Sequence, residues 1–270
     1  MTTTALRSTA LPSTLNLGLA RGGLELREFF RRKEMVIFTF SMPALLLLLL
    51  GSIEHQQYAG QLLTAGMIAA GVVSTSFVSI GVGIALDRED GTLKRLRGTP
   101  MPTSAYFVGK LVLVLVSSLA EVVLLLVIGT LVFGVHLPST GADWLTLAWV
   151  FLLGVIGATM LGIAASSLTR SARSAPAVLN VLFLVLEFIS GIFVVPITDL
   201  PAWMVRAASV FPVKWLAQGF RSVFLPGNLK VLEAAGQWEL PKTALILGAW
   251  CVAGLVLCLL TFRWTNRRAG

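Results

Sequence analysis

The sequence predicts an all-α membrane protein with six transmembrane helices. Hydrophobic residues make up 56% of the 270 residues and charged residues 13%, against about 45–50% and about 25% in soluble domains. Crossing about 30 Å of hydrocarbon takes roughly 20 apolar residues in a helix, and six stretches reach that length. No alternating ten-residue pattern of the kind that forms barrel strands is present. We expect the spans near residues 35–53, 62–86, 107–133, 144–168, 177–195 and 244–262.

The segment before the first span divides into two parts. Residues 1–16 are rich in Ser and Thr, which predicts a flexible tail. Residues 17–34 form an amphipathic pattern that is typical of a helix lying in the plane of the membrane interface. A solvated extension of the first span is the alternative. The two faces of this pattern are Leu19, Leu26, Phe29 and Phe30 on one side and Arg21, Glu25, Glu28, Arg31 and Arg32 on the other.

The distribution of lysine and arginine predicts the orientation of the remaining domain, residues 35–270. The leading 34 residues hold six, the 87–106 loop four with Lys110 just beyond, the 169–176 loop two and the C-terminal tail three, so 16 of the 21 fall on one side. Because cytoplasmic loops retain such residues, both termini are predicted to be cytoplasmic. Anionic lipid headgroups at that face account for the net charge of +8, and a nucleic-acid partner is not expected.

The polar segment 87–104, between the second and third spans, contains signals for a short helix. Gly91 is expected to end the preceding helix and Thr92 to cap a new one. Leu93 and Leu96 then lie three residues apart beside the basic residues Lys94, Arg95 and Arg97, and Pro100 and Pro102 end the segment. We predict a short amphipathic helix held across the cytoplasmic ends of two spans. A plain charged loop is the alternative.

The outer end of the fifth predicted span is interrupted. Gly191 and Pro196 break its apolar run, and Pro201 and Pro212 punctuate the segment that follows. A helix interrupted in this way is expected to bend back toward the outer surface. An ordinary extracellular loop would fit the same residues.

Two ordered motifs occur in these regions. The first comprises Asp87, Arg88, Glu89, Asp90, Gly91, Thr92, Leu93, Lys94, Arg95, Leu96, Thr99 and Pro100. The second comprises Ser190, Gly191, Pro196, Leu200, Pro201, Trp203, Pro212 and Arg221. Together they resemble the motifs of the permease subunits of type 2 ABC exporters, a group that includes daunorubicin-type drug permeases. The departures from the family pattern, which weaken an assignment to a drug subclass, are Asp90, Lys214, Trp215 and Gln218.

The resemblance implies an ATP-driven exporter in a bacterial cytoplasmic membrane that moves an amphipathic drug, lipid or glycan. The chain has no G-x-x-x-x-G-K-[ST] phosphate loop, so ATP and Mg are expected to bind a separate ATPase subunit. No cofactor is expected to bind this chain. Two permeases, as a homodimer or with a close homologue, would pair with two ATPases. The short helix would be the coupling helix, with residues 87–89 and 91–96 contacting the ATPase. Short re-entrant helices would form an exit gate with Ser190, Gly191, Pro196, Pro201 and Pro212.

Two acidic residues fall near the middle of predicted spans, Glu121 in the third and Glu187 in the fifth. An ionised carboxylate there is costly unless it is paired or hydrated. Each is therefore a candidate for lining the substrate path. A neutral carboxylic acid that hydrogen-bonds between helices is the alternative. His55 and His136 are isolated, so no metal site is expected.

Two other classes of protein remain possible from the sequence. A six-span membrane enzyme would need a catalytic set, and neither histidine falls within a span, where a rhomboid-type protease would need one. A stand-alone secondary transporter would show paired broken helices, whereas one clearly broken span is visible. We therefore expect a transport subunit with no catalytic residues.

Overall fold

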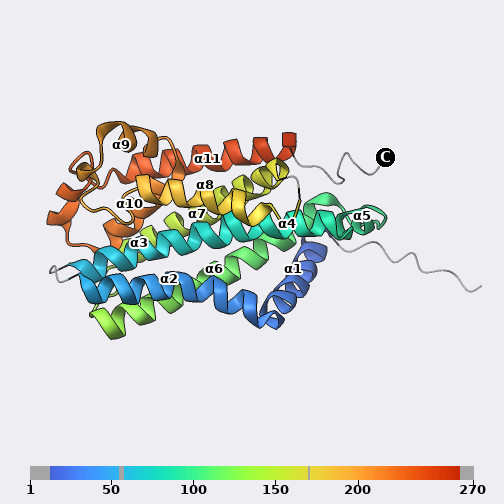
Figure 1. Cartoon of the computed structure of the whole chain (residues 1–270), viewed down its shortest axis with the longest axis horizontal. Coiled ribbons are helices and arrows are strands. Elements are labelled where there is room, and N and C mark those ends of the chain that lie inside the picture. The colour runs from blue at the N-terminus through green and yellow to red at the C-terminus, as the bar shows by residue number, and fades with distance from the viewer. Residues whose placement is uncertain (1–12, 55–57, 170, 262–270) are drawn as a thin grey trace, which may run out of the picture.

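The computed structural model describes residues 13–54, 58–169 and 171–261, which form helices and connecting turns and contain no strand (Figure 1). Five helical segments are long and apolar enough to cross a membrane. They are α2 (Lys33–Ile53), the run α3 (Ala59–Val73), η1 (Ser74–Ser79) and α4 (Ile80–Glu89), α6 (Thr103–Phe133), α7 (Gly141–Ala165) with η2 (Ser166–Leu168), and α11 (Leu240–Thr261).

The sixth apolar helix, α8 (Ala175–Ile189), is shorter than predicted, with 15 residues. It ends six residues before the predicted Val195. The reason is Gly191, which adopts a φ of 70° that residues with a side chain rarely tolerate. The chain continues through η3 (Ile197–Asp199), α9 (Ala202–Ala208), α10 (Pro212–Phe224) and η4 (Gly227–Leu232).

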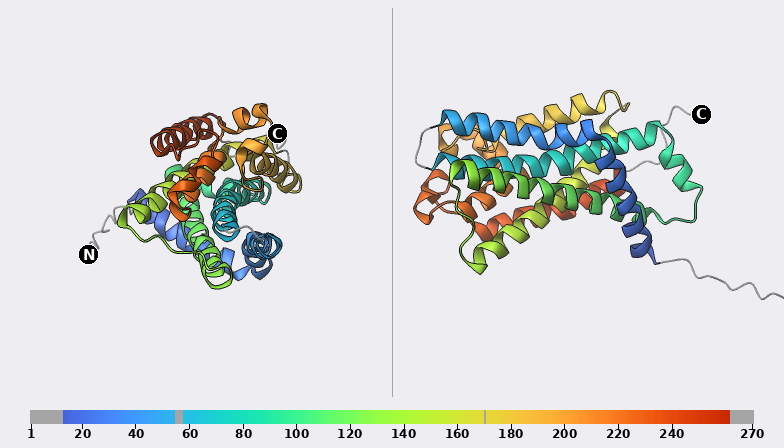
Figure 2. Two further views of the ribbon diagram at one scale, coloured as in Figure 1. Left: turned by 90° about the vertical axis from the view of Figure 1, so that its left-hand side faces the viewer. Right: turned by 90° about the horizontal axis from the view of Figure 1, so that it is seen from below.

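The long helices run side by side, and the short ones gather at the two ends of the bundle (Figures 1 and 2). One end carries α1 (Thr14–Arg31), α5 (Thr92–Arg97) and the last residues of α11; we call it the α5 end. The opposite end carries α9 and η4, and we call it the α9 end. The charged loop and the proline-rich segment therefore lie at opposite ends.

Helix α1 crosses the α5 end of the bundle at a steep angle and packs against α6 (Figure 2). It begins at Thr14, three residues before the predicted Leu17, because the Ser13 hydroxyl caps it by accepting a hydrogen bond from the Asn16 N–H at 3.3 Å. It also ends at Arg31, whereas a helix to Glu34 was expected. Residues 1–12, most of the predicted tail, lie outside the described residues.

The face of α1 that meets α6 includes two glycines, Gly18 and Gly22. A Cβ atom added to Gly22 would lie 2.6 Å from Val112 Cβ, so glycine permits the close approach. Of the four residues predicted for the apolar face, Leu19 is 50% exposed and Phe30 46% exposed. Leu26 and Phe29 are half-buried, and the Phe29 ring packs edge-on against Phe40 of α2.

The π-helix η1 interrupts the long α3–α4 run at its middle and contacts α6, α7 and α8. Gly162 of α7 packs directly on its backbone, because a Cβ there would lie 2.6 Å from the carbonyl oxygen of Phe77. Such single-turn widenings are frequent at functional sites. Two cavities described below open beside η1.

Candidate functional site

The polar segment between α4 and α6 forms the predicted short helix, α5. Gly91 reverses the chain with a φ of 77°, and Asp90 Oδ1 accepts a hydrogen bond from the Thr92 N–H at 2.9 Å. The cap is thus supplied by Asp90, and Thr92 is the first helical residue, not the cap as predicted. Burial raises the pKa of the Asp90 carboxyl, but hydrogen bonds from Thr92 and the nearby charge of Arg95 outweigh burial and lower that pKa overall.

The two leucines of α5 have different environments. Leu93 is fully buried in the core of this chain, whereas Leu96 is only half-buried. The basic side chains Lys94, Arg95 and Arg97 are exposed. Leu93 therefore anchors α5 to its own bundle, although both leucines were expected to contact a partner. Leu96 packs partly against the hydrophobic core, and the three basic residues form the outward surface.

The residues just before α5 bind the end of α4 to its neighbours. The Arg88 guanidinium donates to the Ser166 carbonyl at 3.0 Å and to its hydroxyl oxygen at 3.2 Å. A Glu89 carboxylate oxygen accepts from the Ala172 N–H at 2.6 Å. Contacts within the chain therefore engage Arg88 and Glu89, two of the residues expected to contact a partner.

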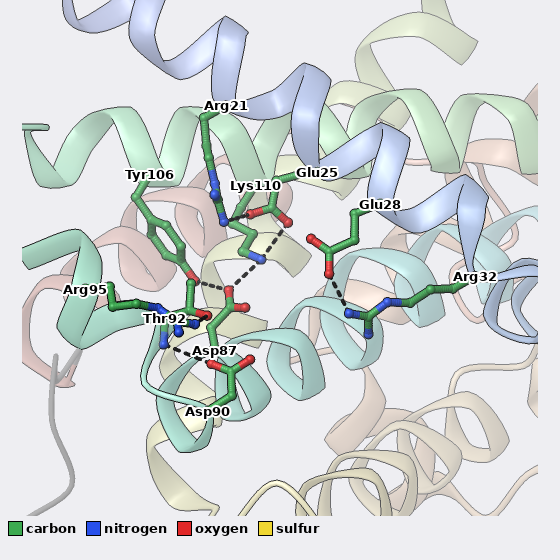
Figure 3. Close-up of polar contacts among 10 residues, drawn as sticks. All are labelled: Arg21, Glu25, Glu28, Arg32, Asp87, Asp90, Thr92, Arg95, Tyr106 and Lys110. Carbon is green, nitrogen blue, oxygen red and sulfur yellow. Dashed lines mark hydrogen bonds and ion pairs between the residues drawn. The ribbon is translucent and has the colours of Figure 1, made fainter. Parts of the chain in front are cut away.

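A buried chain of charges connects α4 with α1 and α6 (Figure 3). Lys110 of α6 lies 2.7 Å from Asp87 and 2.9 Å from Glu25, and Arg21 lies 2.6 Å from Glu25. Tyr106 donates its hydroxyl proton to Asp87 at 2.8 Å. We call Arg21, Glu25, Asp87, Tyr106 and Lys110 the ion cluster. It joins three helices directly behind α5.

Electrostatics within the ion cluster favour the ionised form of Glu25. Burial raises the pKa of this carboxyl, but the adjacent Lys110 and Arg21 outweigh it and hold the pKa below its ordinary value. From the sequence, Glu25 was expected only on the polar face of a helix, and Lys110 only among the basic residues near the cytoplasmic side. The sequence did contain a signal for the ion cluster, which is a lysine within the first turns of an apolar span, one turn after Tyr106.

A cavity of about 570 Å³ lies beside the ion cluster, between α1, α2, the η1–α4 run, α5 and α6. We call it the charged cavity. Its walls include four basic residues (Arg21, Arg32, Arg95 and Lys110) and four acidic residues (Glu25, Glu28, Asp87 and Asp90). Its inner part is lined by hydroxyl groups, including those of Thr75 and Ser117.

The two intramembrane glutamates lie in different places. Glu187 lines a second cavity of about 710 Å³ between α2, the α3–η1–α4 run and α8, which we call the α2–α8 cavity. Glu121 does not line that cavity. It is 1% exposed on α6, where its carboxylate accepts a hydrogen bond from the Thr75 hydroxyl at 2.6 Å. The structure therefore separates the two residues that sequence analysis grouped together.

The residues predicted for an exit gate lie at the α9 end. Ser190 is buried, Pro196 and Pro201 precede η3 and α9, and Pro212 begins α10. The carbonyl of Gly191 accepts a hydrogen bond from Arg221 at 3.0 Å. Arg221 also forms a buried ion pair with Glu233 through contacts of 2.6 and 3.2 Å. Sequence analysis identified Arg221 within a motif but missed Glu233.

The positions where the second motif departs from its usual form lie together on α10. The Lys214 ammonium is 3.7 Å from the centre of the Trp215 ring, a cation–π contact. Gln218 donates to the carbonyl of Trp238 at 2.8 Å. Burial lowers the pKa of Lys214 to about 8. These substitutions therefore form packing and polar contacts that stabilise the α9 end.

A bundle of membrane-length apolar helices with polar ends defines a multi-pass membrane protein. The sequence pattern of the ABC-2 type transporter family matches residues 24–225, and the chain belongs to this family. The matched region includes α5, the α2–α8 cavity, most of the segment at the α9 end, and all of the ion cluster and of the charged-cavity lining except Arg21.

Comparison with curated proteins gives relatives that are named as transport permeases. The probable multidrug ABC transporter permease YbhS of Escherichia coli strain K12 is 26% identical over 167 residues, which cover 62% of this chain and 42% of that protein. The probable multidrug ABC transporter permease YbhR of the same strain is 23% identical over 176 residues, which cover 64% of this chain and 45% of that protein. The match thus spans less than half the length of either relative.

Proposed function

We propose that the chain is the permease subunit of an ATP-driven exporter in a bacterial cytoplasmic membrane, powered by a separate ATPase subunit that binds ATP and Mg. The observation that carries the proposal is the geometry of α5. This helix is anchored on its inner side by Leu93, with Leu96 half-buried beside the charged cavity, and it presents Lys94, Arg95 and Arg97 outward at one end of a membrane bundle. Family membership and the names of the relatives support the same function.

The contacts that join α5 and α4 to the ion cluster give a route by which movement of a partner would reach the membrane spans. A displacement of α5 acts on α4 through the tight turn at Gly91. From Asp87 it passes to α6 and α1 through Lys110 and Glu25. Coupling of this kind requires that the partner bind α5 differently in two states of the bundle. We propose residues 87–89 and 91–96 as the coupling region, with Leu96 at its centre.

We further propose that α8 is a sixth crossing, with the α5 end and both termini in the cytoplasm and the α9 end outside. The excess of basic residues at the α5 end supports this orientation. The short helices η3, α9 and α10 would then be re-entrant and would close an exit beside a second permease copy. Ser190, Gly191, Pro196, Pro201 and Pro212 shape this segment.

The cargo in this proposal is an amphipathic drug, lipid or glycan, and the α2–α8 cavity is part of its path. Glu187 lines that cavity directly. Glu121 acts indirectly, through Thr75. The Thr75 hydroxyl donates a hydrogen bond to Glu121, and Thr75 lines the charged cavity. Surrounding membrane lipids are the other partner of the bundle, through its exposed apolar side chains.

The proposal is tested by purifying the chain with a candidate ATPase that has a phosphate loop, and by reconstituting the complex in proteoliposomes. We expect a stable complex and cargo movement that depends on ATP. Full transport by the permease with no ATPase present would contradict the proposal.

Leu96→Asp tests the role of α5 in the same assay. A charge at the centre of a contact costs about 2 kcal/mol or more, which weakens binding roughly 30-fold. We expect the variant to insert normally but to lose ATP-driven transport. Leu137→Asp is the matched control, since Leu137 is 50% exposed in the connection at the α9 end. Unchanged assembly and transport in Leu96→Asp would rule out α5 as the coupling helix.

A further inference from the structure

A third cavity, of about 330 Å³, lies between α8 and α11 with α7 and η1 in its wall, and we call it the α8–α11 groove. Helix α8 packs against η1, α4, α9 and α10, whereas α11 packs against α7 and α10. The groove shares no described lining residue with the charged cavity or the α2–α8 cavity. Its lining residues on α8, Leu182 and Leu186, lie on the face opposite Leu184, which lines the α2–α8 cavity. The groove is therefore separate from the proposed cargo path.

The described lining of the groove has no charge and no free hydrogen-bond donor. Its polar side chains are Ser167, Trp250 and Thr261. The two hydroxyls donate to backbone carbonyls three and four residues earlier, at 2.6 and 2.7 Å. The Trp250 N–H donates to the carbonyl of Val210 at 2.7 Å. Because apolar cavities of this kind stay dry and bind apolar molecules, the groove is suited to hydrocarbon.

The groove is elongated along the helices. Its lining residues on α11 extend from Leu247 to Thr261, a rise of about 21 Å at 1.5 Å per residue. This length exceeds half of a hydrocarbon layer of about 30 Å. Toward the α9 end the groove is bounded by the rings of Phe211 and Trp250, which stack with their centres 5.9 Å apart. The shape is that of an extended acyl chain lying parallel to the helices.

Basic residues gather beside the α5 end of the groove. Ser167 lines the groove there, and the exposed Arg173 lies in the turn that leads from η2 to α8. Glu89 also contacts this turn through the Ala172 N–H, and the neighbouring Arg88 offsets its charge. The sequence after Thr261 adds three more arginines, which are Arg263, Arg267 and Arg268. A positively charged end of this kind attracts an anionic lipid headgroup.

We propose that the α8–α11 groove holds an acyl chain of an anionic phospholipid, with the phosphate beside Arg173, and that this lipid is a resident part of the protein and not its cargo. The chain fills the space between α8 and α11, so it connects α8 with α7 and α11 through apolar contacts. Arg173 compensates the charge of the phosphate at the α5 end. Binding of this lipid requires neither ATP nor an ATPase.

Native mass spectrometry of the delipidated full chain tests the proposal, after addition of equal amounts of phosphatidylglycerol and phosphatidylcholine with the same acyl chains. Leu182→Trp places an indole in the groove from a position that is 42% exposed, where the core does not have to accommodate the larger ring. Val185→Trp is the matched control, because Val185 is 55% exposed on the same helix and lines none of the three cavities.

We expect the wild type and Val185→Trp to retain phosphatidylglycerol in preference to phosphatidylcholine, and Leu182→Trp to lose both. Arg173→Gln should lower the preference for phosphatidylglycerol about fivefold, because one basic residue near an anionic lipid contributes about 1 kcal/mol. Lys242→Gln, which removes an exposed lysine near the α9 end of α11, should leave the preference unchanged.

Equal lipid retention in Leu182→Trp and Val185→Trp, or equal retention of the two lipids by the wild type, would overturn the inference. Arg173 is exposed, so unchanged selectivity in Arg173→Gln would overturn it even if Leu182→Trp failed to fold. A wild type that binds no lipid, together with loss of a second copy of the chain only in Leu182→Trp, would assign the groove to a protein interface instead.

Addition of ATP to the complex with the ATPase separates a resident lipid from cargo. We expect the bound phosphatidylglycerol to remain in place under conditions in which cargo moves, and its ATP-driven release would overturn the inference. A chain that binds the lipid selectively but supports no ATP-driven transport would contradict the proposed function and leave the lipid site intact.

Discussion

Lys110 is the residue that joins the ends of three helices, since it bridges Glu25 of α1 and Asp87 of α4 from its place on α6. The side chain is 5% exposed. A lysine in a low-dielectric site is stable only when carboxylates compensate its charge. The sequence indicated that the residue lies near a membrane boundary. It did not indicate the partners, because Glu25 is 85 positions away along the chain.

We expect Lys110→Met to destabilise the protein by about 3 kcal/mol, because Asp87 loses its cation and the buried Glu25 keeps only Arg21. Arg32→Met is the control, since Arg32 and Glu28 form a pair that is more than half exposed and worth about 0–1 kcal/mol. Unfolding of both variants in detergent measures the difference. Similar stabilities for the two would contradict the role assigned to the ion cluster.

The buried Glu121 gives a second prediction at this scale. Replacing it by Leu removes the acceptor for the Thr75 hydroxyl, which should cost about 1–3 kcal/mol, whereas Gln retains an oxygen in the same place. At Glu187 we expect the reverse pattern. There Gln should change cargo preference and its pH dependence, while stability holds, because Glu187 faces a cavity. Transport and thermal stability of all four variants test this, and silent Gln variants at both sites would remove support for the path.

At the scale of single helices, apolar periodicity predicted where helices exist better than where they end. The predicted fifth span extended to Val195 because Ile192, Phe193, Val194 and Val195 continue the apolar run beyond the helix. The helix nevertheless ends at Ile189, since backbone conformation at Gly191 overrides hydropathy. For α5 the pattern gave the helix correctly. It could not tell which leucine faces the bundle, because that depends on contacts with other helices.

The ion pair between Arg221 and Glu233 holds η4 against α10 and leads to a prediction for that element. Glu233→Gln should increase amide hydrogen exchange across η4, because the buried Arg221 then loses its countercharge. Lys242→Gln removes an exposed pair with Glu239 and should leave η4 exchange close to that of the wild type. Hydrogen exchange measured by mass spectrometry distinguishes the two. Unchanged protection of η4 in Glu233→Gln would show that the pair is dispensable.

For the whole molecule, the prediction concerns which side of the membrane each end faces. Arg173 and Asp199 are exposed residues just before and after α8. Single cysteines at these positions, in a Cys251→Ala, Cys258→Ala background, should react with a membrane-impermeant maleimide from opposite sides. We expect Asp199→Cys to react in intact cells and Arg173→Cys only in inverted vesicles. Reaction of both from one side would exclude α8 as a crossing.

The fold class and family motifs were predictable because composition and short local patterns determine them. The cavities and the ion cluster were not, since each is assembled from residues far apart in the sequence. Thr39 of α2 and Ser79 of η1 illustrate the difference, since both line the charged cavity and the α2–α8 cavity. Neither residue is unusual in its local sequence, and their relation exists only because α2 and η1 lie beside the same two cavities.

As the proposed sixth crossing, the short helix α8 would make bilayer thickness a variable for this protein. Fifteen residues rise about 22 Å at 1.5 Å each, whereas the hydrocarbon layer is about 30 Å thick. The other long helices have no such deficit, so the mismatch is confined to the side of the bundle that carries α8. Lipid there must thin, or α8 must shift along the membrane normal, at a modest cost for each ångström. Vesicles made from shorter-chain lipids should therefore favour the conformation described here, and transport rates should vary with acyl-chain length even when headgroup and cargo are held constant.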